Sequence, residues 1–232
     1  MEIVPSVYAI DGLGVGRAYL YQEADRLTLI DTGLAGSAER VLAEIERIGR
    51  KPEDLRQIVI THHHRDHIGS LAAILELANA QVLVHQIDAP VVRGERSAPG
   101  PNPVGGWRLV APLMARGAKP AAPSRVDREL SDGDEVDIDG GGRVVHVPGH
   151  TAGSIALYLA QRRLLFAGDA AANTMGLGPP SGPFGLFNEN REHLNESFRK
   201  LAALDFDVAC FGHGKPLDKD ASLAFRRAAE RL

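Results

Sequence analysis

The sequence contains very little cysteine, and this excludes several classes of protein. Its 232 residues include one cysteine, Cys210, so the chain can form no internal disulfide and lacks the paired thiolates of a zinc finger. We expect Cys210, which lies in an apolar segment, to be an inert core thiol. Any metal site must therefore be built from nitrogen and oxygen ligands.

Long apolar runs are also missing. No segment approaches the ~20 apolar residues that a membrane-spanning helix needs. The opening residues lack the basic and then apolar pattern of a secretion signal, so we expect a cytoplasmic protein that does not bind membranes.

Neither sign of charge is in large excess. The 26 basic and 30 acidic side chains give a formal net charge of -4, which argues against a nucleic-acid-binding surface and favours a small-molecule partner. The length and the 44% hydrophobic content predict one globular domain over residues 1–232.

The hydrophobic pattern predicts strands alternating with helices, which is typical of α/β layering. Three short β-rich runs open the chain and predict antiparallel strands at a sheet edge. The strands expected along the whole chain are 7–10, 18–21, 27–30, 57–61, 81–85, 135–138, 143–147, 154–159, 163–166 and 208–211. The expected helices are 37–49, 68–77, 189–204 and 221–232.

Two segments rich in glycine and proline interrupt this pattern, near 94–124 and 173–188. The first contains enough apolar residues for a short helix over 107–115. We interpret the segments as a lid or as an interface, which leaves a homodimer open. Their apolar side chains Trp107, Phe184 and Phe187 are candidates for a substrate pocket. Lys215, two residues after His213, is a candidate to bind an anionic group of the substrate.

The strongest chemical signal is the string from Thr61 to His67, which reads Thr-His-His-His-Arg-Asp-His where an apolar strand ends and a helix begins. Alternate residues of an extended chain point the same way, so His62 and His64 can reach one metal while His63 faces the opposite side. The following turn brings Asp66 and His67 toward a second metal. A dense cluster of this kind is a specific metal-binding pattern.

Three further residues have the same setting, since each is a ligand type at a strand end beside glycine. They are His150, Asp169 and His213. Glycine at such a place allows the backbone to approach the site closely. Asp31 also ends a strand, where it could orient a ligand histidine or cap a turn.

In these motifs the chain resembles the metallo-β-lactamase superfamily, and the similarity runs in order from Asp31-Thr32-Gly33 to Gly212-His213-Gly214. The resemblance implies a four-layer αββα sandwich with two mixed sheets and the metals at one sheet edge. It further implies that the first metal is held by His62, His64 and His150, the second by Asp66, His67 and His213, and both by Asp169.

The aspartate at position 169 indicates which branch of the superfamily the chain resembles, because the antibiotic-destroying members carry cysteine or serine at this position. The chain is in this respect similar to hydroxyacylglutathione hydrolases and lactonases. The resemblance implies a hydrolase of small carboxylic esters, lactones or thioesters that acts through a hydroxide bridging two divalent ions. Asp66 is the candidate proton-transfer residue. Zinc is the expected metal, with iron and manganese left open.

Three alternatives remain open at this stage. Persulfide dioxygenases have similar motifs and use one iron ion. A phosphodiesterase of the same fold would also use two metals, because two ions suit an in-line displacement at phosphorus. A non-catalytic sensor would bind a ligand without turning it over.

Overall fold

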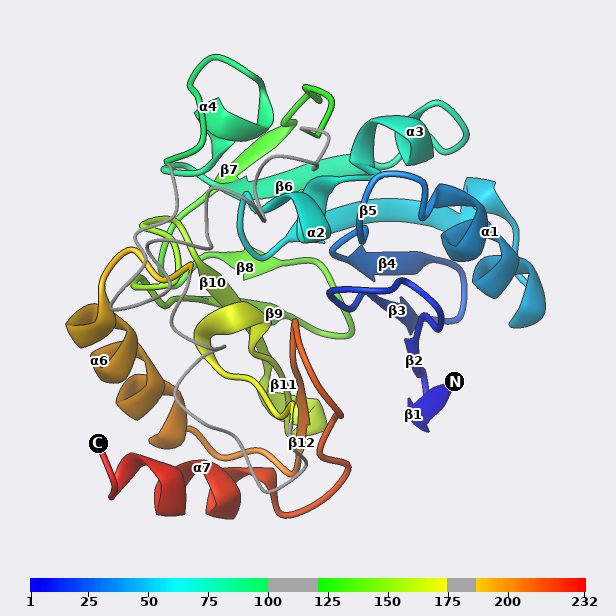
Figure 1. Ribbon diagram of the computed structural model, residues 1–232. Coiled ribbons are helices and arrows are strands. Elements are labelled where there is room, and N and C mark those ends of the chain that lie inside the picture. The colour runs from blue at the N-terminus through cyan, green and yellow to red at the C-terminus, as the bar shows by residue number, and fades with distance from the viewer. Residues whose placement is uncertain (100–120, 175–186) are drawn as a thin grey trace.

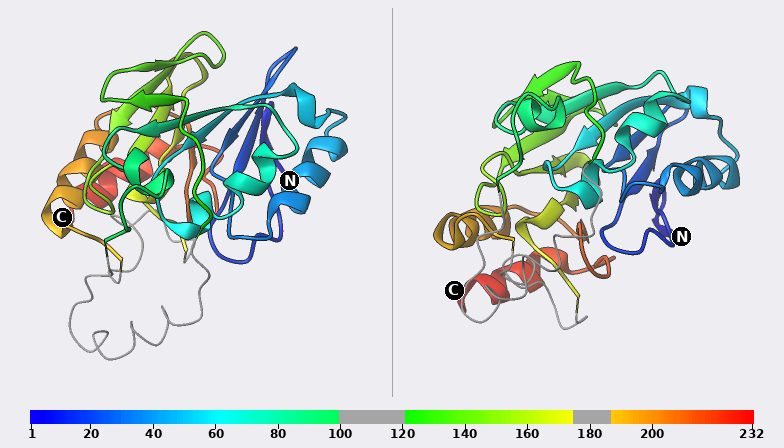
Figure 2. Two further views of the ribbon diagram at one scale, coloured as in Figure 1. Left: turned by 90° about the horizontal axis from the view of Figure 1, so that it is seen from above. Right: turned by 45° about the horizontal axis from the view of Figure 1, so that its top comes forward.

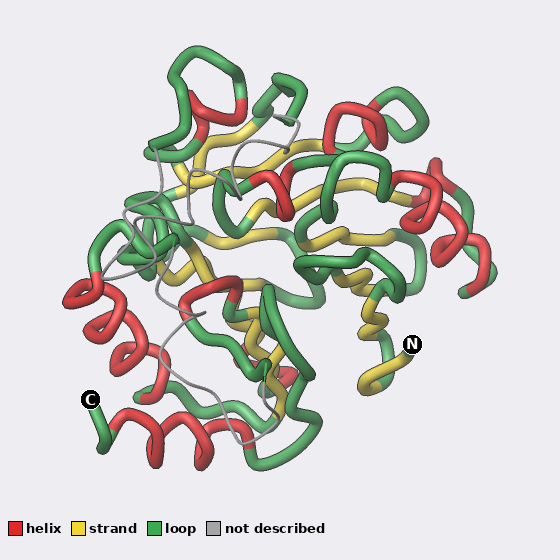
Figure 3. Tube along the Cα trace, in the orientation of Figure 1, coloured by secondary structure: helices red, strands yellow, loops and turns green. Residues whose placement is uncertain are grey.

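Two mixed β sheets lie face to face, and each is covered by helices on its outer side (Figure 1). The structure is a computed structural model that describes residues 1–99, 121–174 and 187–232. Figure 2 shows the two layers from above and obliquely, and Figure 3 shows the helices outside the strands. The four-layer αββα sandwich expected from the resemblance is confirmed.

In the described part of the chain, the first sheet has seven strands in the order in which they occur in the sequence. The first four pair antiparallel and the last four pair parallel, sharing β4. The strands are β1 (Glu2–Val4), β2 (Val7–Ala9), β3 (Tyr19–Gln22), β4 (Leu27–Ile30), β5 (Leu55–Ile60), β6 (Gln81–His85) and β7 (Arg128–Leu130).

Among the residues that the structure describes, the second sheet has five strands in the order β12-β11-β10-β9-β8. Its pairs are antiparallel except β11 with β12, which is parallel. The strands are β8 (Glu135–Val136), β9 (Gly142–His146), β10 (Ile155–Leu159), β11 (Leu164–Phe166) and β12 (Val208–Cys210).

Helices cover both outer faces, and three apolar layers result. On the first sheet lie α1 (Ala38–Arg47), α2 (Arg65–Ile68), α3 (Leu71–Leu75) and α4 (Ala89–Val92), and on the second lie α6 (Arg191–Ala202) and α7 (Ala221–Ala229). Single-turn 3-10 helices span Pro52–Asp54, Ala160–Arg162 and Gly168–Ala170. Apolar clusters fill the space under each helical layer and the space between the sheets.

A buried tyrosine joins the two sheets next to the strand ends. The Tyr19 hydroxyl on β3 donates to the carbonyl oxygen of Phe211 (2.8 Å) and accepts from its N–H group (3.2 Å). Phe211 directly follows β12, so this pair fixes the end of one sheet against the other. Cys210 is buried in the layer between the sheets, and burial raises the pKa of its thiol, as expected of an unreactive core cysteine.

Most of the expected elements form with slightly different ends, and the antiparallel strands at the sheet edge are confirmed. The prediction of a single helix over 68–77 is wrong, because Gly69 and Ser70 separate α2 from α3. A side-chain carbon at Gly69 would lie 2.4 Å from the backbone nitrogen of Ala35. The Ser70 hydroxyl donates to the carbonyl of Leu34 (2.6 Å) and accepts from the N–H of Ser37 (2.8 Å), so a neighbouring loop occupies this position.

Strands β1 and β7 and helix α4 were not expected from the sequence. The strands are three residues long, and in β7 two of the three residues are charged and exposed, so neither shows a clear hydrophobic alternation. The helix expected over 107–115 lies outside the described residues, as does most of each glycine- and proline-rich segment. None of the described helices is long and apolar enough to cross a membrane.

Candidate metal centre

The histidine-rich string follows directly after β5, a fully buried parallel strand for its last four residues. Strand β4 ends beside it, and Asp31 directly after β4 adopts a left-handed backbone conformation with φ of 60°. The two oxygens of the Asp31 carboxylate accept hydrogen bonds from the N–H (2.8 Å) and the hydroxyl (2.7 Å) of Thr61. The start of the ligand turn is therefore fixed to the neighbouring strand.

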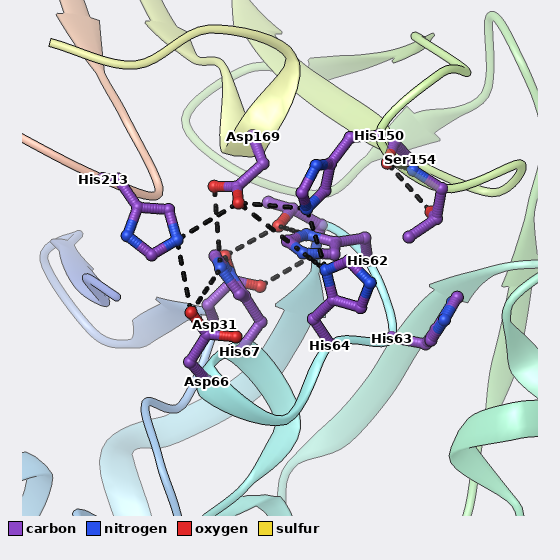
Figure 4. A network of polar contacts seen from close by, with 12 residues as sticks. Asp31, His62, His63, His64, Asp66, His67, His150, Ser154, Asp169 and His213 are labelled. Atoms are coloured by element: carbon purple, nitrogen blue, oxygen red, sulfur yellow. Dashed lines mark hydrogen bonds and ion pairs between the residues drawn. The ribbon is translucent and has the colours of Figure 1, made fainter. Parts of the chain in front are cut away.

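Three histidines form a first cluster (Figure 4). The Nδ1 atom of His64 lies 3.1 Å from the Nε2 atom of His62 and 2.8 Å from the Nε2 atom of His150. All three nitrogens therefore converge on one point. His63 points away from this cluster, as the alternation of an extended chain predicts.

A second cluster consists of Asp66, His67 and His213. The Oδ2 atom of Asp66 lies 3.2 Å from the Nε2 atom of His213 and 3.8 Å from that of His67. Asp169 lies between the two clusters. Its Oδ2 atom is 3.1 Å from the Nε2 atom of His150 and 3.2 Å from that of His213, so one carboxylate contacts both sets.

Each cluster is assembled from both sheets. The residues of the histidine-rich string come from the first sheet, and His150, Asp169 and His213 follow strands β9, β11 and β12 of the second. The three residues of the first cluster are called the first trio, and those of the second cluster the second trio. Each trio contains two residues from the first sheet and one from the second. The site therefore depends on the packing of the two sheets against each other.

Buried hydrogen bonds fix which ring nitrogen faces the centre. The Nδ1 atom of His67 lies 2.7 Å from the Oδ2 atom of Asp31, and that of His150 lies 2.8 Å from the Oδ1 atom of Asn188. Both oxygens are acceptors, so Nδ1 donates in each histidine and the lone pair of a neutral ring is left on Nε2. Of the two roles considered for Asp31, the structure shows contact with a histidine of the cluster.

Two glycines allow the backbone to pass close to the cluster. A side-chain carbon at Gly212 would lie 1.9 Å from the Oδ1 atom of Asp169 and 2.7 Å from the Cε1 atom of His67. A carbon at Gly168, whose φ is 53°, would lie 2.9 Å from the Cβ atom of Thr61. Space excludes a larger residue at both positions, and at Gly168 the left-handed backbone conformation adds to this.

The electrostatics of the two clusters differ. Burial and the neighbouring imidazoles hold the pKa values of His62 and His64 well below the usual value for histidine. Burial also lowers the pKa of His67 and His213, but nearby carboxylates outweigh it. Asp31 and Asp169 raise the pKa of His67 to about 9, and Asp169 raises that of His213 to about 10.

The two carboxyl groups of the centre are held in the charged form. Burial raises the pKa of Asp169, but His67, His150 and His213 outweigh it and bring the pKa well below its ordinary value. Burial acts in the same sense on Asp66, whose pKa is nevertheless lowered by His67 and His213. Both side chains are therefore carboxylates at neutral pH, as metal ligands must be.

The arrangement is suited to binding divalent metal cations. The Nε2 atom of His67 and the Oδ1 atom of Asp169 are among the buried atoms for which the described residues provide no hydrogen-bond partner. Leaving such atoms without any partner is costly. Imidazole nitrogens and carboxylate oxygens suit zinc, iron and manganese. The His67 and Asp169 atoms lie 3.6 Å from each other, and a cation bound between them would give both a partner.

Comparisons with known proteins agree with this geometry. The sequence model of the Metallo-beta-lactamase superfamily matches residues 11–213. The chain belongs to this superfamily. The probable metallo-hydrolase YflN of Bacillus subtilis is 31% identical over 225 residues, which cover 90% of this chain and 84% of that protein.

A second group of superfamily relatives consists of hydroxyacylglutathione hydrolases. The protein of this name from Cereibacter sphaeroides (strain ATCC 17025) is 32% identical over 200 residues. The match covers 84% of this chain but 61% of the relative, so the chain spans about three fifths of the length of this hydrolase.

Solved structures of superfamily members have the same fold. A metallo-beta-lactamase family protein from Thermus thermophilus superposes with a TM-score of 0.72 at 25% identity, covering 99% of this chain and 80% of that one. A beta-lactamase from Chitinophaga pinensis superposes with a TM-score of 0.71 at 23% identity, covering 100% of this chain and 89% of that one.

The structure brings all seven ligand candidates of this superfamily member together. The substrate candidates are less concentrated. The ring of Phe187 lies 6.3 Å from that of His64 between centroids and the residue is 39% exposed, whereas Lys215 is exposed. Trp107 and Phe184 lie outside the described residues.

Sequence reasoning missed Asn188, which orients His150, and Asp88, which contacts His63. Asn188 is the last residue of one of the glycine- and proline-rich segments, and Asp88 stands before a helix like an ordinary cap. Neither has a local pattern that would have identified it.

Proposed function

We propose that the protein is a dinuclear metal-dependent hydrolase of small carboxylic esters, lactones or thioesters. The observation that carries this proposal is the position of Asp169, whose Oδ2 atom lies 3.1 Å from His150 of one trio and 3.2 Å from His213 of the other. In this proposal His62, His64 and His150 would hold one ion, and Asp66, His67 and His213 would hold the other. Asp169 would contribute to both sites.

Two divalent cations bound in this way would lower the pKa of a water molecule toward ~7 and polarise the carbonyl group that is attacked. The protein's own residues then have to handle protons and orient the substrate. Asp66 is suited to the first task, because its carboxylate is ionised and its side chain is 18% exposed, against 2% for Asp169. It can accept a proton from water and deliver it to the leaving group.

Phe187 is suited to bind an apolar part of the substrate. It lies beside His64 and directly precedes Asn188, which hydrogen-bonds His150, so its backbone is fixed next to the first trio. An exposed aromatic side chain at the edge of a polar centre suits a hydrocarbon group of modest size. This favours an acyl substrate over a highly charged one. The hydroxyacylglutathione hydrolases among the relatives support a thioester or a related acyl compound.

The test combines metal analysis with a substrate screen. Protein produced with added zinc, iron or manganese is expected to contain two ions per chain and to hydrolyse at least one lactone, thioester or simple ester faster than any phosphodiester. A single ion that resists further loading, together with oxygen consumption on a persulfide, would instead identify a dioxygenase. Ligand binding without turnover of any substrate would identify a sensor.

Matched histidine variants test the assignment of the two trios. His150→Ala removes a residue from one trio and His213→Ala from the other, so each variant should lose one ion and most activity. The control is His193→Ala, which changes an exposed histidine on α6. This control should retain both ions. Equal metal content in all three variants would refute the assignment.

A further inference from the structure

Asp88 is a buried carboxylate behind the metal centre, and its position in the chain does not explain its contacts. It follows β6 and stands at the first position before α4, where an aspartate usually caps the helix. Its side chain makes no such cap and is 1% exposed. The carboxylate is directed into the molecule instead.

The contacts of Asp88 reach two separate turns. Its Oδ2 atom accepts a hydrogen bond from the N–H group of His63 (2.9 Å) and another from the hydroxyl of Thr151 (3.0 Å). The Nδ1 atom of His63 lies 2.9 Å from the same oxygen. One carboxylate oxygen therefore joins a turn of the first sheet to a turn of the second.

Both turns carry residues of the first histidine trio. His63 stands between His62 and His64, and Thr151 directly follows His150. Across the same boundary between the sheets, the Nδ1 atom of His64 lies 2.8 Å from the Nε2 atom of His150. Asp88 thus fixes from behind the two backbone segments that present these nitrogens.

The second turn is shaped around the carboxylate. A side-chain carbon at Gly153 would lie 2.2 Å from the Oδ1 atom of Asp88, so glycine is required for the turn to close on it. Within the turn, the Ser154 hydroxyl accepts from the N–H of Thr151 (3.0 Å) and lies 2.9 Å from the Thr151 hydroxyl. The turn around Thr151 therefore leaves space for the Asp88 carboxylate and also holds the Thr151 hydroxyl in place to donate to it.

We propose that Asp88 is a positioning residue that sets the distance between His150 and the pair His62 and His64, and so the affinity of the first metal ion. The proposal rests on the proposed metal site. Asp88 touches neither an ion nor the substrate and acts through the two turns. Residues that orient metal ligands from behind are typically worth about 10- to 100-fold in metal affinity.

The experiment measures zinc affinity by competition with a chromophoric chelator, in the His213→Ala background where the second trio is incomplete. Asp88→Asn keeps the volume of the side chain but replaces the carboxylate, which accepts from the His63 N–H and the Thr151 hydroxyl, by an uncharged amide. This variant should bind the remaining ion about 10- to 100-fold more weakly. The cobalt-loaded protein should also show an altered visible absorption spectrum.

Thr151 supplies a second pair of variants in case Asp88→Asn does not fold. Thr151→Val keeps the shape but removes the hydroxyl that Asp88 accepts from, and it should weaken zinc in the same direction. Thr151→Ser keeps the hydroxyl and should restore affinity. The matched control is Asp127→Asn, because Asp127 accepts from the N–H of Val82 (2.8 Å) at the opposite end of β6.

The outcomes separate this inference from the proposed function. If the unmodified protein binds no metal, the proposed function fails and the inference fails with it. If the protein binds two ions but Asp88→Asn and Thr151→Val bind zinc like their parent, only the inference is overturned. It is also overturned if Asp127→Asn weakens zinc as much, because the effect would then be a general loss of stability.

Discussion

Metal uptake by this protein should release protons, and the structure gives their number and source. In the metal-free protein the pKa of His67 is raised to about 9 and that of His213 to about 10, so both imidazoles carry a proton at pH 7. A histidine must be neutral to bind a metal. Filling the second trio at pH 7 should therefore displace about two protons.

The pH dependence of affinity follows from this number. With two protons displaced, the affinity of the second trio should fall by about 100-fold for each pH unit lost below the two pKa values. The pKa values of His62 and His64 lie well below the usual value, so these rings are neutral at pH 7 and release no proton. Acidification should therefore empty the second trio first.

Calorimetric titration of the metal-free protein with zinc, in buffers of different ionisation enthalpy, measures the protons released. In Asp31→Asn the largest attraction that raises the pKa of His67 is removed, so release at pH 7 should fall toward one proton. Asparagine tolerates the left-handed backbone at this position. Release of less than one proton by the unmodified protein, or no change in the variant, would refute the reasoning.

Three substitutions test other parts of the site. Asp66→Asn should retain the first ion and lower kcat by about 10²- to 10⁴-fold, measured with metal content on the same sample, and unchanged kcat would exclude proton transfer by this residue. Gly212→Ala would place a carbon 1.9 Å from the Oδ1 atom of Asp169 and should therefore reduce metal content below two ions per chain; two retained ions would contradict this. Phe187→Ala should raise KM several-fold for longer acyl chains with little change in kcat, since a half-exposed ring contributes about 1 kcal/mol of binding; an equal effect on short chains would argue against the contact.

The sequence predicted the fold well wherever hydrophobic periodicity was strong. Strand β5 and helix α6 have clear apolar patterns and form close to their expected ends. Strand β7 has one buried residue in three, so it has no pattern to read and depends on pairing with β6. The break between α2 and α3 arises from a loop that packs against Gly69, and contacts of this kind are not encoded locally.

In the candidate site, too, residues with a local sequence pattern could be predicted and residues that depend on distant contacts could not. The histidines and aspartates of the two trios stand at strand ends beside glycine or in a dense motif, and both features are visible in one sequence. Asn188 and Asp88 act across 38 and 25 residues of chain, on His150 and His63 respectively. Contacts between residues so far apart in the sequence depend on the packing of the two sheets, and they can therefore be recognised only in the structure.

The hydrogen bonds between Tyr19 and Phe211 hold the two sheets together, and this affects the geometry of the candidate metal centre. Since each trio includes residues from both sheets, the thickness of the apolar layer between the sheets sets how closely the residues of a trio approach one another. A bulkier or smaller side chain in that layer would change this spacing at a distance. Interior packing can therefore tune the reactivity of the site while every residue that touches an ion stays the same.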